Sequence, residues 1–157
     1  MPNQLRTILE LCAGEGDITK QLTPAYKVMA VELLPERVRR GRKKAPDAEW
    51  IQADLESEHF YDEFSHTDFD AVVMNPPFKL GMYALSLASD FIRKNQCNRV
   101  IAILPSDYFV AKKRRQAYTR LKLAITKEFR IGNVAYIDGR ASAKPRPDSI
   151  FVFKRIK

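Results

Sequence analysis

Residues 70–78, Asp-Ala-Val-Val-Met-Asn-Pro-Pro-Phe, decide the fold and locate the functional site. The first five residues form a largely apolar run that predicts a buried strand of a parallel sheet. Residues 75–78 then lie at the carboxyl end of that strand, the edge at which open α/β sheets bind their ligands. Two prolines make a rigid turn with few free N–H groups, so the Asn75 and Pro76 carbonyl groups are presented beside the Phe78 ring.

Hydrogen-bond acceptors beside an aromatic face suit one task, which is to hold an extruded planar base that carries an amino group. The structural alternative is a Pro-Pro turn after a strand, with Phe78 packed in the core. One tetrapeptide does not decide between the two readings. A second motif, upstream in the chain, favours the functional one.

Composition predicts a single domain over residues 1–157, with no separate target-recognition domain. No apolar run is long enough to span a membrane and no signal peptide is visible, so we expect a soluble cytoplasmic protein. Cys12 and Cys97 match no zinc or Cys-x-x-Cys spacing, and His59 and His66 have no partner cluster. We therefore expect no metal site.

The charge predicts a polyanionic partner. Lys and Arg total 27 against 19 acidic residues, for a formal net charge of +8, which favours nucleic acid or, less often, anionic lipid. A basic surface that only aids solubility is the alternative. The cations cluster in residues 37–44, 112–115 and 144–157, while acidic residues concentrate between 47 and 70. This uneven distribution predicts one basic face.

Strand and helix signals alternate along the chain, as in βαβ units. The fold class expected is α/β: a Rossmann-like, seven-stranded, mostly parallel sheet with an antiparallel last strand and helices on both faces. Strands are predicted at 7–11, 27–32, 50–54, 69–74, 99–104, 129–137 and 150–156. A short helix is predicted to end at Leu22, and further helices at 36–44, 83–94 and 112–126. The last two strands resemble an antiparallel hairpin joined by the loop 138–149, and residues 55–68 read as a polar connection.

The upstream motif is the loop at residues 10–17, which follows the first predicted strand and precedes a helix. Gly14 and Gly16 let the backbone approach a ligand at a helix N-terminus. Two glycines make a weak dinucleotide fingerprint, and the pattern does not fit a phosphate-binding Walker loop. The Glu10 carboxylate instead suits a ligand with a positive amino group, such as S-adenosylmethionine.

Two more acids, Glu32 and Asp54, end the next two predicted strands. Glu32 is placed to accept hydrogen bonds from two ribose hydroxyls, as an acid does at this position in nucleoside-binding folds. Asp54 is placed to receive the amino group of an adenine. Each acid alone is as well explained by a helix cap or a solvated turn. Three acids at three successive strand ends favour a single extended cofactor.

Together these motifs resemble the class I S-adenosylmethionine-dependent methyltransferases, and specifically those that methylate the exocyclic amine of adenine in nucleic acid. The cofactor loop precedes the catalytic loop, as in the gamma-type order of that family. One departure is Cys12, where many relatives have a glycine, and we expect a small packed residue there rather than a nucleophile. The resemblance implies these cofactor-binding residues: Glu10, Cys12, Ala13, Gly14, Gly16, Glu32, Leu33, Asp54, Leu55 and Asn75.

By the same resemblance Asn75, Pro76, Pro77 and Phe78 form the catalytic loop. The Asn75 side-chain oxygen and the Pro76 carbonyl would accept the two N–H bonds of the target amine, and Phe78 would stack on the flipped base. No covalent intermediate, metal or redox cofactor is required. Methylation of a cytosine ring carbon would need a Pro-Cys nucleophile, and neither cysteine follows a proline.

Contacts to nucleic acid are expected from segments at the same sheet edge. A solvated helix face or loop is the alternative for each charge run, and the basic helix at 36–44 is expected to lie away from the base. The residues expected to contact nucleic acid are Lys79, Tyr108, Lys112, Lys113, Arg114, Arg140, Lys144 and Arg146.

The leading hypothesis is an adenine N(6)-methyltransferase that acts on DNA by base flipping and direct methyl transfer. One alternative changes the substrate to the adenine or guanine amine of RNA. Another is protein glutamine methylation. It is disfavoured by the basic charge and by Phe78, because the fourth residue of the motif is usually Tyr in proteins that methylate glutamine. A non-catalytic subunit that binds the cofactor or nucleic acid is the last. Small size suits a phage or restriction-modification enzyme, with a specificity partner subunit or a homodimer left open.

Overall fold

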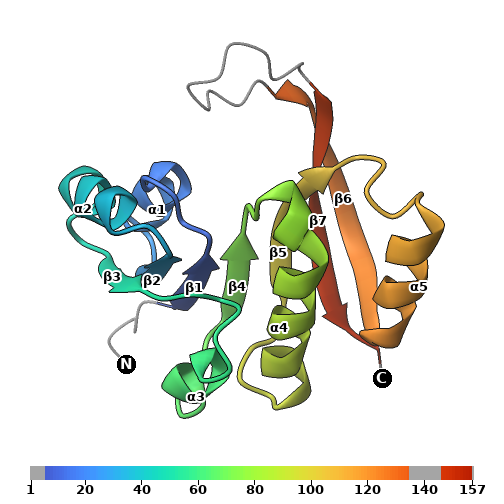
Figure 1. Ribbon diagram of the computed structural model, residues 1–157, viewed down its shortest axis with the longest axis horizontal. Coiled ribbons are helices and arrows are strands. Elements are labelled where there is room, and N and C mark those ends of the chain that lie inside the picture. The colour runs from blue at the N-terminus through green and yellow to red at the C-terminus, as the bar shows by residue number, and fades with distance from the viewer. Residues whose placement is uncertain (1–5, 135–145, 157) are drawn as a thin grey trace.

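A seven-stranded sheet in the order β3-β2-β1-β4-β5-β7-β6 organises the chain (Figure 1). The computed structural model describes residues 6–134 and 146–156. Strands β1 to β5 run parallel, β7 runs antiparallel to β5, and β6 runs antiparallel to β7. The predicted fold class is confirmed. The strands are β1 (Thr7–Leu11), β2 (Lys27–Glu32), β3 (Glu49–Gln52), β4 (Ala71–Met74), β5 (Val100–Pro105), β6 (Leu123–Val134) and β7 (Arg146–Arg155).

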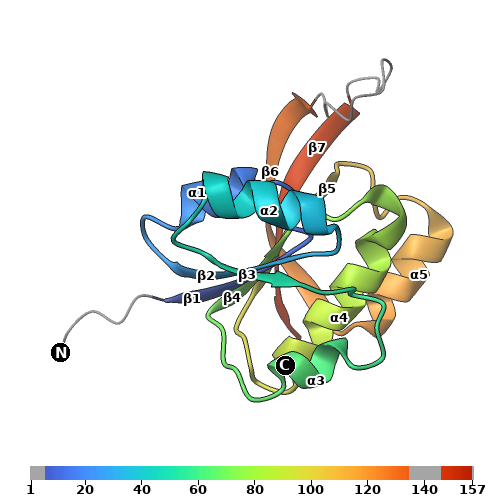
Figure 2. The same cartoon turned by 60° about the vertical axis from the view of Figure 1, so that its left-hand side comes forward.

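Helices cover both faces of the sheet (Figure 2). The helices α1 (Asp17–Leu22) and α2 (Pro35–Lys44) lie on one face, and α3 (Phe60–Phe64), α4 (Gly81–Arg93) and α5 (Lys112–Arg120) lie on the other. A large core that includes Leu9, Val72, Phe91 and Phe153 fills the α3–α5 side. A smaller core around Trp50 fills the α1–α2 side. Both faces of the central strands are therefore buried, as parallel strands require.

The sheet has its switch point between β1 and β4. From β1 the chain moves outward to β2 and β3, and it then returns to add β4 and β5 on the other side. Leu11 at the end of β1 is the register partner of Met74 at the end of β4. The loops that follow these two residues are therefore neighbours at the carboxyl edge, where a crevice forms in open α/β sheets.

Three described element boundaries differ from the sequence prediction by more than three residues, namely the end of α5 and the starts of β6 and β7. Helix α5 ends at Arg120, so the helix predicted over 112–126 is wrong over residues 121–126, and β6 begins at Leu123 rather than 129. Lys122 has a left-handed φ of 53°, which ends the helix. Leu123 then pairs with Arg155, and this pairing of β6 with β7 overrides the helical spacing of Leu121 and Ile125.

Strand β7 begins at Arg146, inside the predicted loop 138–149, because Asp148 and Ser149 pair with the end of β5. The part of that loop before Arg146, and residues 135–137 of the predicted strand 129–137, lie outside the described residues. The connection 55–68, predicted to be polar, contains α3, whose Phe60 and Phe64 rings are buried with centroids 5.0 Å apart.

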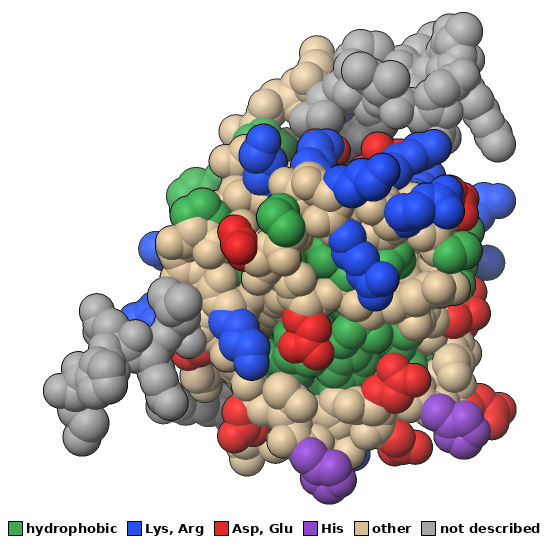
Figure 3. Space-filling view, turned by 90° about the vertical axis from the view of Figure 1, so that its left-hand side faces the viewer, with side chains coloured by type: hydrophobic (Ala, Val, Ile, Leu, Met, Phe, Trp, Pro, Cys, Tyr) green, Lys and Arg blue, Asp and Glu red, His purple; other side chains and the backbone are tan. Residues whose placement is uncertain are grey.

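The cations do not form the single face that the sequence predicted. Helix α2 lies over the β2–β3 end of the sheet, whereas α5 lies at the other end (Figure 1). Seen from the β3 side, Lys and Arg side chains gather over α2, and acidic and His side chains gather toward α3 (Figure 3). The molecule therefore has two separate basic surfaces.

None of the described helices is both long and apolar enough to cross a bilayer.

Candidate active site

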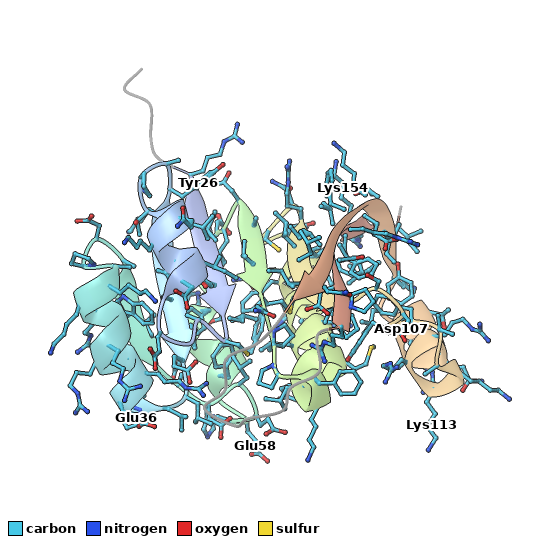
Figure 4. The ribbon with its side chains drawn as sticks, turned by 90° about the horizontal axis from the view of Figure 1, so that it is seen from above. Tyr26, Glu36, Glu58, Asp107, Lys113 and Lys154 are labelled. Atoms are coloured by element: carbon cyan, nitrogen blue, oxygen red, sulfur yellow. The ribbon has the colours of Figure 1, made fainter. Side chains whose placement is uncertain are left out.

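The carboxyl ends of β1, β2, β3 and β4 bring four predicted segments to one edge of the sheet. Because these strands are parallel neighbours, the loop after β1, Glu32, Asp54 and Asn75 all lie at that edge. Figure 4 looks down on this edge, with Glu36 of α2 at one end of the molecule and Lys113 of α5 at the other. The candidate site lies between these two helices.

The two glycines of the loop after β1 have different surroundings. Gly14 has φ of 59°, and a Cβ at this position would have no atom within 4 Å. Gly16 has φ of 89°, and a Cβ there would lie 2.9 Å from the Trp50 ring. Left-handed backbone favours glycine at both positions. Gly14 therefore borders open space where a ligand can approach, whereas Gly16 makes room for the core.

The Glu32 carboxylate fastens this loop to the end of β2. One carboxylate oxygen accepts the Gly14 N–H at 2.8 Å, and the other accepts the Leu34 N–H at 3.0 Å. The Ala13 N–H also donates to the Val31 carbonyl at 2.9 Å. These bonds fix the turn without covering the outer side of Gly14.

Glu10 is buried under the loop, with 1% of its surface exposed. The Thr19 hydroxyl of α1 donates to its carboxylate at 2.7 Å. Burial raises the pKa of Glu10 from 4.5 to about 7, and the Thr19 hydrogen bond opposes that rise. The carboxyl is therefore poised to ionise when a positive group comes near.

Cys12 carries a left-handed φ of 58° and is half-buried. Burial, with Glu32 and Glu10 nearby, raises the pKa of its thiol to about 12. A thiol that stays protonated is a poor nucleophile. The geometry favours the packing role that the sequence predicted for Cys12.

The remaining residues expected at the cofactor divide into buried and exposed ones. Ala13 and Leu55 are buried, whereas Leu33 is half exposed, directly after Glu32. Asp54 is exposed, and its side chain accepts the Glu56 N–H at 2.9 Å in a local turn. Leu33 and Asp54 thus follow neighbouring strands and are both open to a ligand at this edge.

Asn75 and Pro76 present the acceptors that the sequence predicted. Asn75 is half-buried, Pro76 is buried, and the Pro77 carbonyl is used by the Leu80 N–H at 2.8 Å. Within residues 6–134 and 146–156, neither the Asn75 amide nor the Pro76 carbonyl has a hydrogen-bond partner. The hydrogen-bonding capacity of both acceptors is therefore not used by the described part of the chain.

Phe78 projects from this loop with 48% of its surface exposed. The Tyr108 ring packs edge-on against it at 5.9 Å between centroids. The Arg114 guanidinium lies 5.2 Å from the centre of the Phe78 ring, and the Arg146 guanidinium lies 5.5 Å from it. The ring is therefore flanked by two cations and rests on a second aromatic residue.

Tyr108 has a supporting position. It is 2% exposed, and the backbone of Met82 hydrogen-bonds its hydroxyl. A Cβ on Gly81 would lie 2.2 Å from that hydroxyl, so only glycine fits there. The burial of Tyr108 does not favour the direct nucleic-acid contact that the sequence predicted. The structure instead indicates that the ring holds Phe78 in place.

The other residues expected to bind nucleic acid are divided by the fold. Lys79 is exposed beside Phe78, and Lys112 and Lys113 are exposed in the first turn of α5. Arg140 and Lys144 lie outside the described residues.

Trp50, Gly41, Thr19 and Gly81 were not identified from the sequence. Trp50 fills the space between Gly16 and Gly41, and its indole N–H donates to the Ala45 carbonyl at 3.0 Å. A glycine inside a predicted helix, as at position 41, was the available signal of close packing. Thr19 gave no such signal, because its contact with Glu10 depends on how α1 lies on the sheet.

A cavity of about 320 Å³ lies away from this site, between α4, the end of α5 and the end of β7. It is at the opposite edge of the sheet and is not part of the candidate site. The described residues contain no group of three or more His, Cys, Asp or Glu that could hold a metal ion.

The strand order, the glycine loop after β1 and the carboxylate that ends β2 define a Rossmann-like, nucleoside-binding α/β domain. A family model described as a methyltransferase domain matches residues 8–93, more than half of the chain. The chain belongs to this methyltransferase domain family and is a class I S-adenosylmethionine-dependent methyltransferase.

Solved structures of several methyltransferases share this fold. A TehB-like S-adenosylmethionine-dependent methyltransferase from Corynebacterium glutamicum is 19% identical, with 99% of this chain and 83% of that chain covered and a TM-score of 0.65. The ribosomal protein L11 methylase of Lactobacillus delbrueckii is 13% identical (98% and 72% covered, TM-score 0.67). The N-methyltransferase NodS of Bradyrhizobium japonicum is 14% identical (98% and 87% covered, TM-score 0.67). The search of curated proteins found no match. These similarities extend to the fold and leave the substrate open.

The site fits the cofactor of this family. The open side of Gly14 admits a ligand against the backbone, and the carboxylates of Glu10 and Glu32 match the ammonium and the ribose hydroxyls of S-adenosylmethionine. The exposed Leu33 and Asp54, which follow β2 and β3 at the same edge, are the residues expected to receive the adenine.

Proposed function

We propose that the protein methylates the exocyclic amine of adenine in nucleic acid, with DNA as the leading substrate. The observation that carries this proposal is a pair of acceptors, on Asn75 and Pro76, that have no hydrogen-bond partner among residues 6–134 and 146–156. They lie beside the exposed Phe78 ring and next to the cofactor loop. A flipped adenine has two amine hydrogens, which the Asn75 and Pro76 oxygens can accept. It also has a flat face, which can stack on the Phe78 ring.

The acceptors address the main chemical difficulty. The lone pair of an exocyclic amine is delocalised into the purine ring, so the nitrogen is a poor nucleophile. When the Asn75 and Pro76 oxygens accept its two N–H bonds, they draw the nitrogen toward tetrahedral geometry and aim its lone pair at the cofactor side. The cofactor supplies an electrophilic methyl group on a sulfonium. With that cofactor bound, a carbon–nitrogen bond would form as the carbon–sulfur bond breaks, and the amine held by Asn75 and Pro76 would lose a proton to solvent.

Phe78 offers the flipped base a stacking surface. Stacking of a base on an aromatic ring contributes about 1–3 kcal/mol, which helps to offset the cost of unstacking. Tyr108 fixes the direction of the ring, so that little conformational entropy is lost when the base binds.

The first turn of α5 supports a polyanionic substrate. It contains Lys112, Lys113, Arg114 and Arg115, and no acidic residue. Cations at a helix N-terminus oppose the helix dipole and typically cost about 0.3–1 kcal/mol each. Placing four of them there is unfavourable for the helix alone, and it is explained if phosphates bind this end of α5.

RNA is the second candidate substrate, because Asn75, Pro76 and Phe78 would hold a flipped adenine from either polymer. Methylation of a protein glutamine is less well supported. A neutral amide side chain has no negative charge to pair with the Arg114 and Arg146 cations beside Phe78. A non-catalytic subunit is disfavoured by the two acceptors, which have no structural use within the described residues.

The test compares Asn75→Ala with the control Asn98→Ala, which changes an exposed asparagine in the α4–β5 loop. Purified variants are assayed with labelled S-adenosylmethionine on matched DNA and RNA, and cofactor affinity is measured by calorimetry. We expect Asn75→Ala to lose turnover at least a hundredfold while its cofactor affinity changes little. Equal turnover of the two variants would reject the assigned role of Asn75.

A further inference from the structure

Two arginines beside Phe78 are fixed in place, unlike the surface lysines around them. The Arg114 Nε–H donates to the Tyr108 carbonyl, and its guanidinium lies 4.7 Å from the centre of the Tyr108 ring as well as 5.2 Å from that of Phe78. The Arg146 Nε–H donates to the Asp148 carboxylate at 3.0 Å. Asp148 is completely buried and its side chain is fixed by the surrounding protein, so its carboxylate restricts the position of the Arg146 side chain.

Both anchors use the Nε end of the side chain. Besides Nε–H, a guanidinium carries Nη–H donors in a planar fork that matches the two oxygens of a phosphate. Holding the side chain in advance also reduces the rotamer entropy that would be lost on binding. Arg114 comes from α5 and Arg146 from β7, so two separate elements place cations at one ring.

This arrangement fits the chemistry of a nucleotide within a chain. Such a nucleotide carries a phosphate on each side of its sugar, and a base that stacks on Phe78 brings both phosphates with it. We propose that the Arg114 and Arg146 guanidinium groups bind the two backbone phosphates that flank the target base. The inference rests on the proposed function, and it narrows the substrate class to a polynucleotide, which excludes a protein amide or a free nucleoside.

The test uses single-adenine DNA oligonucleotides in which one phosphodiester is replaced by a neutral methylphosphonate. The replacement lies on the 5′ side of the adenine, on its 3′ side, or six nucleotides away. If RNA is the substrate, 2′-O-methyl RNA is used instead. The KM for methyl transfer is measured for the wild type and for Arg114→Gln and Arg146→Gln. Arg120→Gln is the control, because it removes an exposed cation from the far end of α5.

For the wild type, a neutral linkage beside the adenine should raise KM about tenfold, the effect of losing one charge-assisted hydrogen bond. The distant replacement should change KM little. Each arginine variant should become insensitive to one of the two flanking positions, and Arg120→Gln should behave as the wild type. A role confined to anchoring α5 or β7 would lower thermal stability and leave the sensitivity to each position intact.

Two outcomes would overturn the inference: a wild type that is insensitive to both flanking replacements, or arginine variants that keep the sensitivity of the wild type. Failure of the proposed function looks different, because no methylated nucleoside would then be recovered from any oligonucleotide. Label in a co-incubated protein substrate would reject both proposals and favour amide methylation.

Discussion

At the residue scale, the two glycines of the cofactor loop separate ligand binding from folding. Gly14→Ala places a methyl group in open space at a left-handed φ, which costs about 1 kcal/mol in stability and narrows the approach to the backbone. Gly16→Ala adds a collision with the Trp50 ring, and it should cost about 2–3 kcal/mol.

Thermal unfolding and calorimetric titration with S-adenosylmethionine distinguish the two variants. We expect Gly16→Ala to show the larger fall in melting temperature. For a given fall in melting temperature, Gly14→Ala should show the larger loss of affinity for S-adenosylmethionine. The reverse pattern would place the cofactor elsewhere.

Glu10 makes stability depend on pH. The pKa of its carboxyl is about 7 in the folded chain against 4.5 in a model peptide, so the folded state binds the proton more tightly. The free energy of unfolding should therefore fall as pH rises from about 4.5 to about 7, by up to about 3 kcal/mol, and level off above that.

Glu10→Gln cannot ionise and should lack this dependence. Urea denaturation at pH 5, 6, 7 and 8 checks the prediction, and the stability of Glu10→Gln relative to the wild type should increase with pH. A constant difference between the two proteins across this range would mean that Glu10 is ionised in the folded state throughout.

The sequence was enough to predict which candidate site residues lie at strand ends. Glu32 ends β2, Asp54 and Asn75 follow β3 and β4, and the parallel sheet brings all three to one edge. The buried supports could not be predicted in the same way. The packing of Trp50 against Gly16 and of Gly81 against Tyr108 joins residues far apart in the chain, and it exists only after the helices have docked.

At the element scale, α5 carries cations where a helix least tolerates them. Replacing Lys112 and Lys113 together by Gln should raise the free energy of unfolding by about 1 kcal/mol, because it relieves the helix N-terminus. If both lysines contact phosphates, the same change should reduce the slope of log affinity against log salt by about 2.

Arg120→Gln is the matched control, since it removes a cation from the helix C-terminus, where a positive charge is favourable. It should lower stability slightly and leave the salt slope unchanged. Fluorescence anisotropy with a labelled oligonucleotide at several salt concentrations gives the slope. Equal slopes for all three proteins would exclude α5 from the nucleic-acid interface.

Periodicity located most elements, and it failed where pairing determines the structure. Leu121 and Ile125 have helical spacing, but residues from Leu123 onward pair with β7 and form a strand. Helix α3 was missed because the acidic residues around it mask the two phenylalanines that it buries. In both cases contacts distant in sequence override the local pattern.

At the scale of the whole molecule, one edge of one sheet carries the candidate chemistry. The switch between β1 and β4 places the cofactor loop beside Asn75, and α5 and β7 add the cations around Phe78. The alternation of strands and helices was enough to predict this sheet. It could not show that the basic segments would separate into two surfaces, because that depends on which end of the sheet each helix covers.

The most direct test of the proposed function identifies the methylated product. Purified protein is incubated with labelled S-adenosylmethionine and matched DNA and RNA, the polymers are digested to nucleosides, and the labelled species is identified by mass spectrometry. We predict label on the amino group of deoxyadenosine, or of adenosine if RNA is the substrate. Confirmed cofactor binding with no label in any nucleoside would contradict the proposal that this site methylates a base amine.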